Sequence, residues 1–141
     1  EAEWEYAARG GKFHTEGYKY SGRDRLKDVG WVAENSGGAT KIVGLKYPNQ
    51  LGVHDMSGNV WEWCEDDWHE KYKDAPENGS AWIDKPRGTF RVFRGGSWYD
   101  GALFCRAAIR DRVAPAGRGF NLGFRLVLAP QSVGRPVPAF L

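Results

Sequence analysis

The stretch from Arg94-Gly95-Gly96-Ser97-Trp98 to Asn121-Leu122-Gly123-Phe124-Arg125 decides how this chain of 141 residues is interpreted. Its two ends have the composition of a fixed scaffold. The positions between them mix Gly, Asp, aromatic and aliphatic residues, and arginines recur at Arg106, Arg110, Arg112 and Arg118. A core strand needs one apolar and one polar face, and a solvated loop holds few large apolar side chains. The stretch therefore favours a binding surface carried by a rigid frame.

Length and composition predict one domain built from short elements. A chain of this length can bury a real core. It holds 7 Trp and 19 Gly, and helical periodicity is scarce, which indicates many turns and a Trp-rich core. No apolar run approaches the ~20 residues of a membrane helix, so we expect no membrane span.

Charge is distributed unevenly along the chain. From Arg87 onward there are nine Arg, no Lys and two Asp, a net charge of +7, whereas residues 1–86 carry 11 basic and 16 acidic residues, a net charge of −5. A basic third could bind nucleic acid. The arginines form no contiguous block, however, and Arg pairs well with carboxylates through its planar fork. We therefore expect them to pair with the acidic part of the chain, and we expect no nucleic-acid partner.

Local patterns predict one helix and several short strands. Residues 1–9 form an amphipathic pattern that Gly10-Gly11 ends, and residues 65–88 form a polar surface excursion. The tail 130–141, with Pro136 and Pro138, is expected to be an extended strap or frayed. Strands are expected near Trp31 and over residues 41–45, 61–64, 90–94, 107–110 and 123–128.

Four motifs in this order carry a family resemblance. They are Glu1–Gly11, Asp55-Met56-Ser57-Gly58-Asn59-Val60-Trp61-Glu62-Trp63, Arg94–Trp98 and Leu122–Arg125. Together they resemble the formylglycine-generating-enzyme (sulfatase-modifying-factor) family, which implies an α+β, C-type-lectin-like fold. Residues 1–141 would be a single domain that matches the C-terminal portion of the family domain. The resemblance therefore implies that an N-terminal segment or a second chain completes the fold.

The resemblance also specifies where the catalytic residues of the family's oxidase would lie. That oxidase uses two cysteines to hold copper and to meet the substrate thiol. Their places fall at Ala102 and Ala107, neither of which has a thiol to ligate metal or bind substrate covalently. We therefore expect no catalytic residue, no catalytic cofactor and no enzyme activity. Cys64 and Cys105 are expected to form a disulfide or a buried pair of thiols.

A structural Ca²⁺ site is a further implication of the resemblance. Its ligands would be the side chains of Asp55 and Glu62 and the carbonyl oxygens of Gly58 and Val60, all of which suit a hard cation. The alternative, that Asp55 and Glu62 accept hydrogen bonds from backbone N–H groups of the turn, stays open.

Within the family, the chain resembles the variable proteins of diversity-generating retroelements. Those proteins change residues encoded by AAC codons through adenine-directed mutagenesis. Every suspect position here holds a residue that an AAC codon can become by changing adenines alone. These candidate variable, ligand-binding positions lie within residues 93–121 and are Phe93, Tyr99, Asp100, Gly101, Leu103, Phe104, Ile109, Asp111, Val113, Gly117, Gly119, Phe120 and Asn121.

The preferred interpretation is a non-catalytic, ligand-binding protein with a hypervariable surface. Its partner would be a protein or cell-surface ligand, and it would act at a cell surface, outside the cell or on a virion. Trp98 and Phe124 are expected to be buried in the frame, and the candidate variable side chains to share one exposed face. The alternatives are a family enzyme that uses different chemistry and an interaction domain without diversification.

Overall fold

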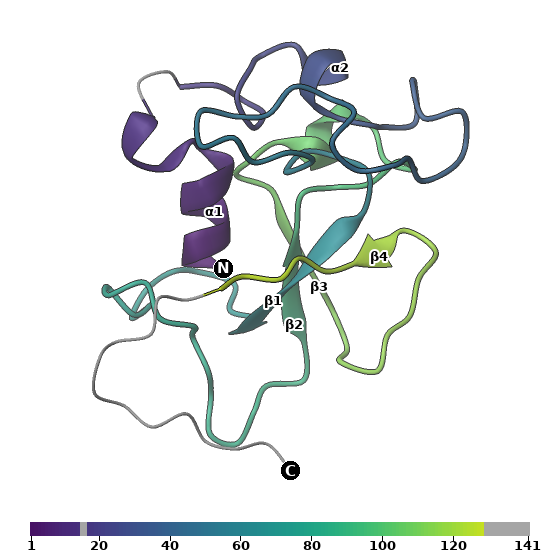
Figure 1. Ribbon diagram of the computed structural model, residues 1–141. Coiled ribbons are helices and arrows are strands. Elements are labelled where there is room, and N and C mark those ends of the chain that lie inside the picture. Colours follow the sequence, from purple (N-terminus) through teal and green to yellow (C-terminus); the bar gives the residue numbers. More distant parts are fainter. Residues whose placement is uncertain (15–16, 129–141) are drawn as a thin grey trace.

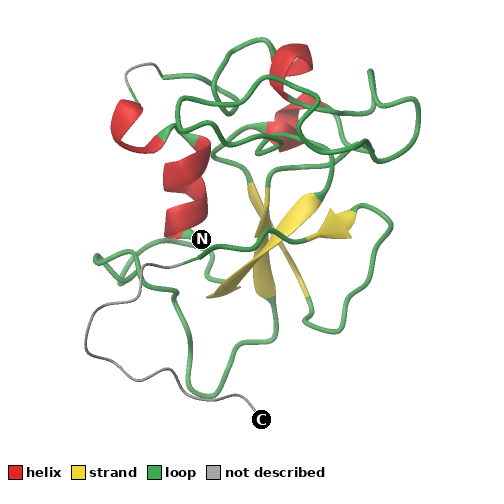
Figure 2. Cartoon of the chain, in the orientation of Figure 1, coloured by secondary structure: helices red, strands yellow, loops and turns green. Residues whose placement is uncertain are grey.

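A four-stranded sheet in the order β3-β2-β1-β4 forms the centre of the computed structural model, which describes residues 1–14 and 17–128 (Figure 1). Strand β2 pairs antiparallel with both β1 and β3, whereas β4 pairs parallel with β1. The strands are β1 (Trp61–Asp67), β2 (Arg91–Arg94), β3 (Arg110–Val113) and β4 (Leu122–Gly123). Figure 2 shows that loops make up most of the rest of the chain.

Helices cover one side of the sheet. They are α1 (Ala2–Ala8), α2 (Leu26–Val29) and the 3-10 turns η1 (Gly11–Phe13) and η2 (Ala102–Cys105). Helix α1 ends where predicted, because Gly10 adopts a left-handed backbone with φ 92° that disfavours other residues. After β4 the chain crosses in front of the sheet toward the N-terminal end of α1 (Figure 1). No helix among the described residues is long and apolar enough to span a membrane.

Two predicted strands are wrong, because polar side chains take the place of a neighbouring strand. Residues 41–45 and the region around Trp31 are turns and loops. The Asn59 side chain accepts from the N–H of Lys41 and donates to its carbonyl, at 2.9 and 3.2 Å. The side chain of Asn35 accepts from Val32 N–H at 2.7 Å. The backbone groups are thus satisfied without a sheet.

The other predicted strands are present with shifted limits. Strand β1 continues to Asp67, so the polar excursion starts later than expected. Strand β3 begins at Arg110 because Ile109 N–H closes a turn onto Arg106. Strand β4 contains two residues only, and the predicted strand over 123–128 does not form. The predicted tail, 130–141, lies outside the described residues.

The apolar core is small and divided in two. One cluster contains Trp4, Ala8, Met56 and Ala107, and the other contains Leu26, Val29, Val32 and Cys105. Cys64 packs against the first cluster, and both cysteines are free thiols. The expected disulfide or thiol pair is therefore wrong, because each sulfur packs in a different cluster.

The expected pairing of arginines with the acidic part of the chain is confirmed. Six of the nine arginines from Arg87 onward contact carboxylates that lie between Glu1 and Glu70. The pairs are Arg87 and Arg91 with Asp67, Arg94 with Glu1 and Glu5, Arg110 with Glu1, Arg112 with Glu70, and Arg125 with Glu62. The positive and negative parts of the sequence thus bind each other within one fold.

Arg94 is the most deeply buried of these arginines. Its side chain has no solvent exposure, and it contacts Glu1 at 2.9 Å, Glu5, and the carbonyl of Ala107 at 3.0 Å. It also lies over the Trp4 ring, 5.3 Å from its centroid. One guanidinium therefore joins β2 to α1 and to the chain that follows η2.

We expect Arg94→Met to lower the free energy of unfolding by about 3 kcal/mol, because it removes the buried cation that Glu1 and Glu5 share and leaves them paired only with Arg110 and Arg9. Arg112→Met is the matched control on the neighbouring strand, since Arg112 and Glu70 are both exposed and such pairs contribute less than about 1 kcal/mol. Urea unfolding of both variants measures the difference. Equal losses would contradict the central role of Arg94.

Candidate functional site

The candidate binding surface is formed by parts of residues 93–121 that come from β2, β3, η2 and their connecting loops. None of the thirteen candidate variable positions is buried, and six are exposed. The exposed ones are Tyr99, Leu103, Phe104, Asp111, Gly119 and Phe120. Tyr99 and Phe120 keep 62% and 69% of their surface exposed, which is high for aromatic residues that could have packed in a core.

Strand register places three candidate positions on one face of β2 and β3, the face that also carries Arg91, and it places Arg94 and Arg110 on the other. Phe93 lies opposite Asp111, and Arg94 lies opposite Arg110. Directly opposed residues of an antiparallel pair point to the same face, and neighbours along a strand point to opposite faces. Phe93, Asp111 and Val113 therefore share one face of this pair, while Arg94 and Arg110 face α1 and its carboxylates.

Contacts join several candidate positions to one another. The Phe93 ring meets Trp61 edge-on, with centroids 4.6 Å apart. The Trp61 indole N–H donates to Asp100 at 2.8 Å. Beyond Asp100, the Tyr99 ring lies edge-on to Phe120, with centroids 5.4 Å apart. Segments from β2, the turn after it and the loop before β4 are thus brought together.

Three of the thirteen positions are tied to the frame, by which we mean the buried or hydrogen-bonded residues that hold this surface. Asp100 accepts from Trp61 and from the Ser97 hydroxyl. Asn121 donates to Ser97 Oγ at 3.2 Å. A Cβ added to Gly117 would lie 2.5 Å from a methyl carbon of Val113. These positions are partly exposed, but the Asp100 and Asn121 side chains also hold local structure, and Gly117 leaves no room for a side chain.

Trp98 and Phe124 differ from the expectation that both are buried. Phe124 is 71% exposed, because the next residue, Arg125, turns its guanidinium toward Glu62. Trp98 is half-buried, and its ring lies against Tyr99 and Phe120, 5.5 and 5.6 Å away. Sequence reasoning assigned Trp98 to the frame and missed its place at the surface. Its position directly beside Tyr99 was the available signal.

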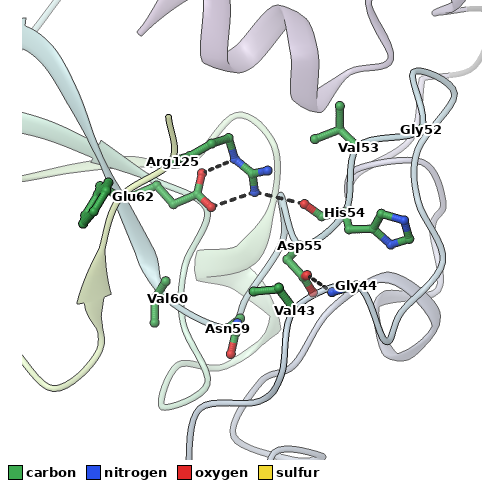
Figure 3. A pocket seen from close by; sticks show the side chains of 11 residues that line it. Val43, Gly44, Gly52, Val53, His54, Asp55, Asn59, Val60, Glu62 and Arg125 are labelled. Atoms are coloured by element: carbon green, nitrogen blue, oxygen red, sulfur yellow. Dashed lines mark hydrogen bonds and ion pairs between the residues drawn. The ribbon is translucent and has the colours of Figure 1, made fainter. Parts of the chain in front are cut away.

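Three of the four expected calcium ligands, Asp55, Val60 and Glu62, line a cavity of about 450 Å³, and Gly58 does not; the set does not fit a calcium site in this structure (Figure 3). Both oxygens of Glu62 accept from Arg125, at 2.9 and 2.7 Å, and one also accepts from Trp4 at 2.7 Å. Asp55 accepts from Gly44 N–H at 2.7 Å, and its other oxygen is buried without a partner. A cation at Glu62 would have to displace Arg125, so the carboxylates act here as hydrogen-bond acceptors.

The places of the family's catalytic cysteines are packing positions in this chain. Ala102 packs against the cluster around Leu26, and Ala107 is buried beside Trp4. Burial raises the pKa of Cys64 to about 11 and that of Cys105 to about 12. Both remaining sulfurs are therefore protonated thiols at neutral pH, which are poor nucleophiles and metal ligands.

Alkylation of the folded protein tests this assignment. With a pKa of about 11, only roughly a thousandth of Cys64 is thiolate at pH 8. We expect iodoacetamide to label neither cysteine appreciably at pH 7–8, and labelling to become fast once urea unfolds the chain. Rapid labelling of the folded protein at pH 7 would show an activated thiol.

The geometry defines a C-type-lectin-like scaffold, and comparisons with known proteins identify its family. The model of the sulfatase-modifying factor enzyme 1-like domain matches residues 1–130, so the chain belongs to that family. It is 35% identical to the formylglycine-generating enzyme of Thermomonospora curvata, over 92% of this chain and 48% of that protein.

Two solved structures support the fold. Treponema denticola variable protein 1 superposes with a TM-score of 0.70 and 36% identity, over 86% of this chain and 43% of the other. PvdO from Pseudomonas aeruginosa superposes with a TM-score of 0.72 and 37% identity, over 87% and 48%. The chain thus spans about half the length of these relatives, and the α+β, C-type-lectin-like assignment is confirmed.

Two glycines test which part of residues 93–121 is frame and which is surface. Gly96 has φ +70°, and an added Cβ would lie 2.5 Å from Cys105 Sγ, whereas a Cβ at Gly101 would enter open space. We expect Gly96→Ala to lower the free energy of unfolding by more than about 2 kcal/mol and Gly101→Ala to change it by less than about 0.5 kcal/mol. Urea unfolding compares the two variants, and a large loss at Gly101 would place that position in the frame.

Proposed function

We propose that this chain is a non-catalytic, ligand-binding protein whose variable surface is diversified by a retroelement. One observation carries the proposal: the buried residues of the 93–121 stretch all lie outside the thirteen candidate positions. These buried residues are Arg94, Gly95, Gly96, Ser97, Cys105 and Ala107. Residues that hold the fold and residues free to contact a partner are therefore separated within a single stretch of sequence.

The separation suits a protein that must change its contacts without changing its fold. Substitutions at exposed positions alter stability little, whereas those at buried positions alter it strongly. A preorganised frame also reduces the ordering that binding requires. The likeness to Treponema denticola variable protein 1 supports the proposal.

The proposal that this chain is not a catalyst rests on Ala102 and Ala107, which stand where the family's oxidase has its two cysteines. Formylglycine formation by the family's route needs a thiolate to bind metal and the substrate thiol, and Ala102 and Ala107 offer none. The alternative is a family enzyme that uses other chemistry. Oxygen consumption by the copper-treated protein with a cysteine-containing peptide would favour that alternative.

Sequencing the gene and its neighbourhood tests diversification directly. We expect a near-copy of codons 93–121 that differs only where it carries adenines, together with a reverse-transcriptase gene. The differing codons should fall within the thirteen positions and not at Arg94, Ser97 or Ala107. A neighbourhood without such a copy would return the chain to an interaction domain without diversification.

We also propose that further polypeptide, from the same or a second chain, covers an apolar area beside the cavity of Figure 3. Val43 and Phe124 line that cavity and are 73% and 71% exposed, and Leu126 follows at 87%. Exposed apolar groups in such density favour burial against a partner. A monomer in light scattering that binds no hydrophobic dye would contradict this idea.

A location at a cell surface or on a virion fits a protein that displays a binding surface, and it is part of the proposed function.

A further inference from the structure

The centre of the candidate surface is an aromatic cluster, defined as Trp98, Tyr99 and Phe120. The three ring centroids are 5.4–5.6 Å apart, and Tyr99 meets both of the other rings edge-on. The backbone of Trp98 is held by a 2.8 Å bond to the carbonyl of buried Asn59. Edge-to-face rings of this kind support one another, so the cluster presents a fixed apolar shape.

The polar groups beneath the cluster are partly engaged. Ser97 is fully buried, and its hydroxyl contacts both Asp100 Oδ2 and the Asn121 amide nitrogen. Asp100 Oδ2 in addition accepts the Trp61 indole N–H at 2.8 Å. Because Tyr99 meets the other two rings edge-on, the cluster presents interlocked rings, and a protruding apolar group fits such a surface better than a flat sugar ring does.

Two charges lie close to the cluster along the chain: Asp100, which is hydrogen-bonded to Trp61 and Ser97, and Arg118. Arg118 lies two residues before Phe120 and is exposed, and it forms no ion pair with a carboxylate among the described residues. Most other arginines of this region are paired with acids. Arg118 is therefore available to a partner, where it would favour a carboxylate and disfavour a cation.

We propose that the aromatic cluster binds a protein loop that has an apolar tip flanked by Asp or Glu. Aromatic anchors surrounded by a charged rim are the usual centre of a protein interface. Trp98 would supply a constant contact, whereas Tyr99 and Phe120 would supply contacts specific to this sequence. The inference rests on the proposed function, because it names the kind of partner which that same surface takes.

A randomised library of disulfide-cyclised dodecapeptides, displayed on phage and selected against the whole chain, provides the probe. We expect the selected peptides to be enriched in Leu, Phe or Met at the tip and in Asp or Glu beside it. The best peptide is then synthesised and titrated against variants. Phe120→Ala and Tyr99→Ala should each weaken its binding roughly tenfold to thirtyfold. Arg118→Ala should weaken it about twofold to fivefold at low salt and have no effect at 0.5 M salt.

Matched controls separate contact from folding. Tyr6 on α1 is 59% exposed, close to the value for Tyr99, so Tyr6→Ala should leave affinity unchanged. All variants should keep the wild-type melting temperature within a few degrees. If Phe120→Ala does not, Phe120→Ser is titrated in its place. Selected peptides with basic flanks, or binding that survives both aromatic substitutions, would overturn the inference.

A glycan array separates failure of the protein-loop partner from failure of the proposed ligand-binding function. Glycan binding that Phe120→Ala abolishes, without selection of any peptide, would overturn the protein-loop partner and leave the proposed ligand-binding function standing. If neither peptides nor glycans bind in a way that depends on the thirteen positions, both the inference and the proposed function fail.

Discussion

The buried guanidinium of Arg94 is the interaction on which the rest of this structure depends. It joins the central strand β2 to Glu1 and Glu5 of the helical side and to the carbonyl of Ala107. Burial alone would raise the pKa of Glu5, but the charge of Arg94 and hydrogen bonds from Arg9 and Arg94 lower it. Because a buried charge is stable only with its partners in place, the helix, the sheet and the chain after η2 are fixed together. Exposed positions between these two anchor points, such as Tyr99 and Leu103, can then differ in sequence without moving the ends of the segment.

Charge pairing fixes Arg94, Arg110 and Arg112 on one face of β2 and β3, whereas the other face combines the Arg91–Asp67 pair with candidate positions such as Asp111. Arg110 and Arg112 stack on the Trp68 ring at 4.3 and 4.8 Å and contact carboxylates, whereas the intervening Asp111 is exposed. The two-residue period of a strand thus assigns alternate positions to stability and to the surface. This explains how arginines and such varied residues can alternate along one strand, a pattern that a conventional core strand would not show.

The sequence predicted the parts of the fold that depend on local signals and on charge balance. Gly10 ended α1, the turn before Trp61 led into β1, and the arginines paired with acids as expected. The failures share a cause that lies in tertiary contacts. Asn59 replaced a strand partner for Lys41, and a contact of the same kind joins Arg125 to Glu62, a carboxylate of the expected calcium set. Each is a long-range side-chain contact that no local pattern encodes.

Side-chain hydrogen bonds also reduce the number of candidate positions at which a substitution would leave the fold unchanged. The adenine rule treats all thirteen positions alike, but replacing Asp100 would leave the buried Trp61 without its 2.8 Å acceptor. An unsatisfied buried donor costs about 1–3 kcal/mol, a large share of the stability of a small domain. Tyr99, Leu103 and Phe120 have no such role, since their side chains reach solvent. Trp98, which the adenine rule omits, packs against Tyr99 and Phe120. The candidate binding surface is therefore defined by exposure and hydrogen bonding together. The residues that an AAC codon can become describe it incompletely.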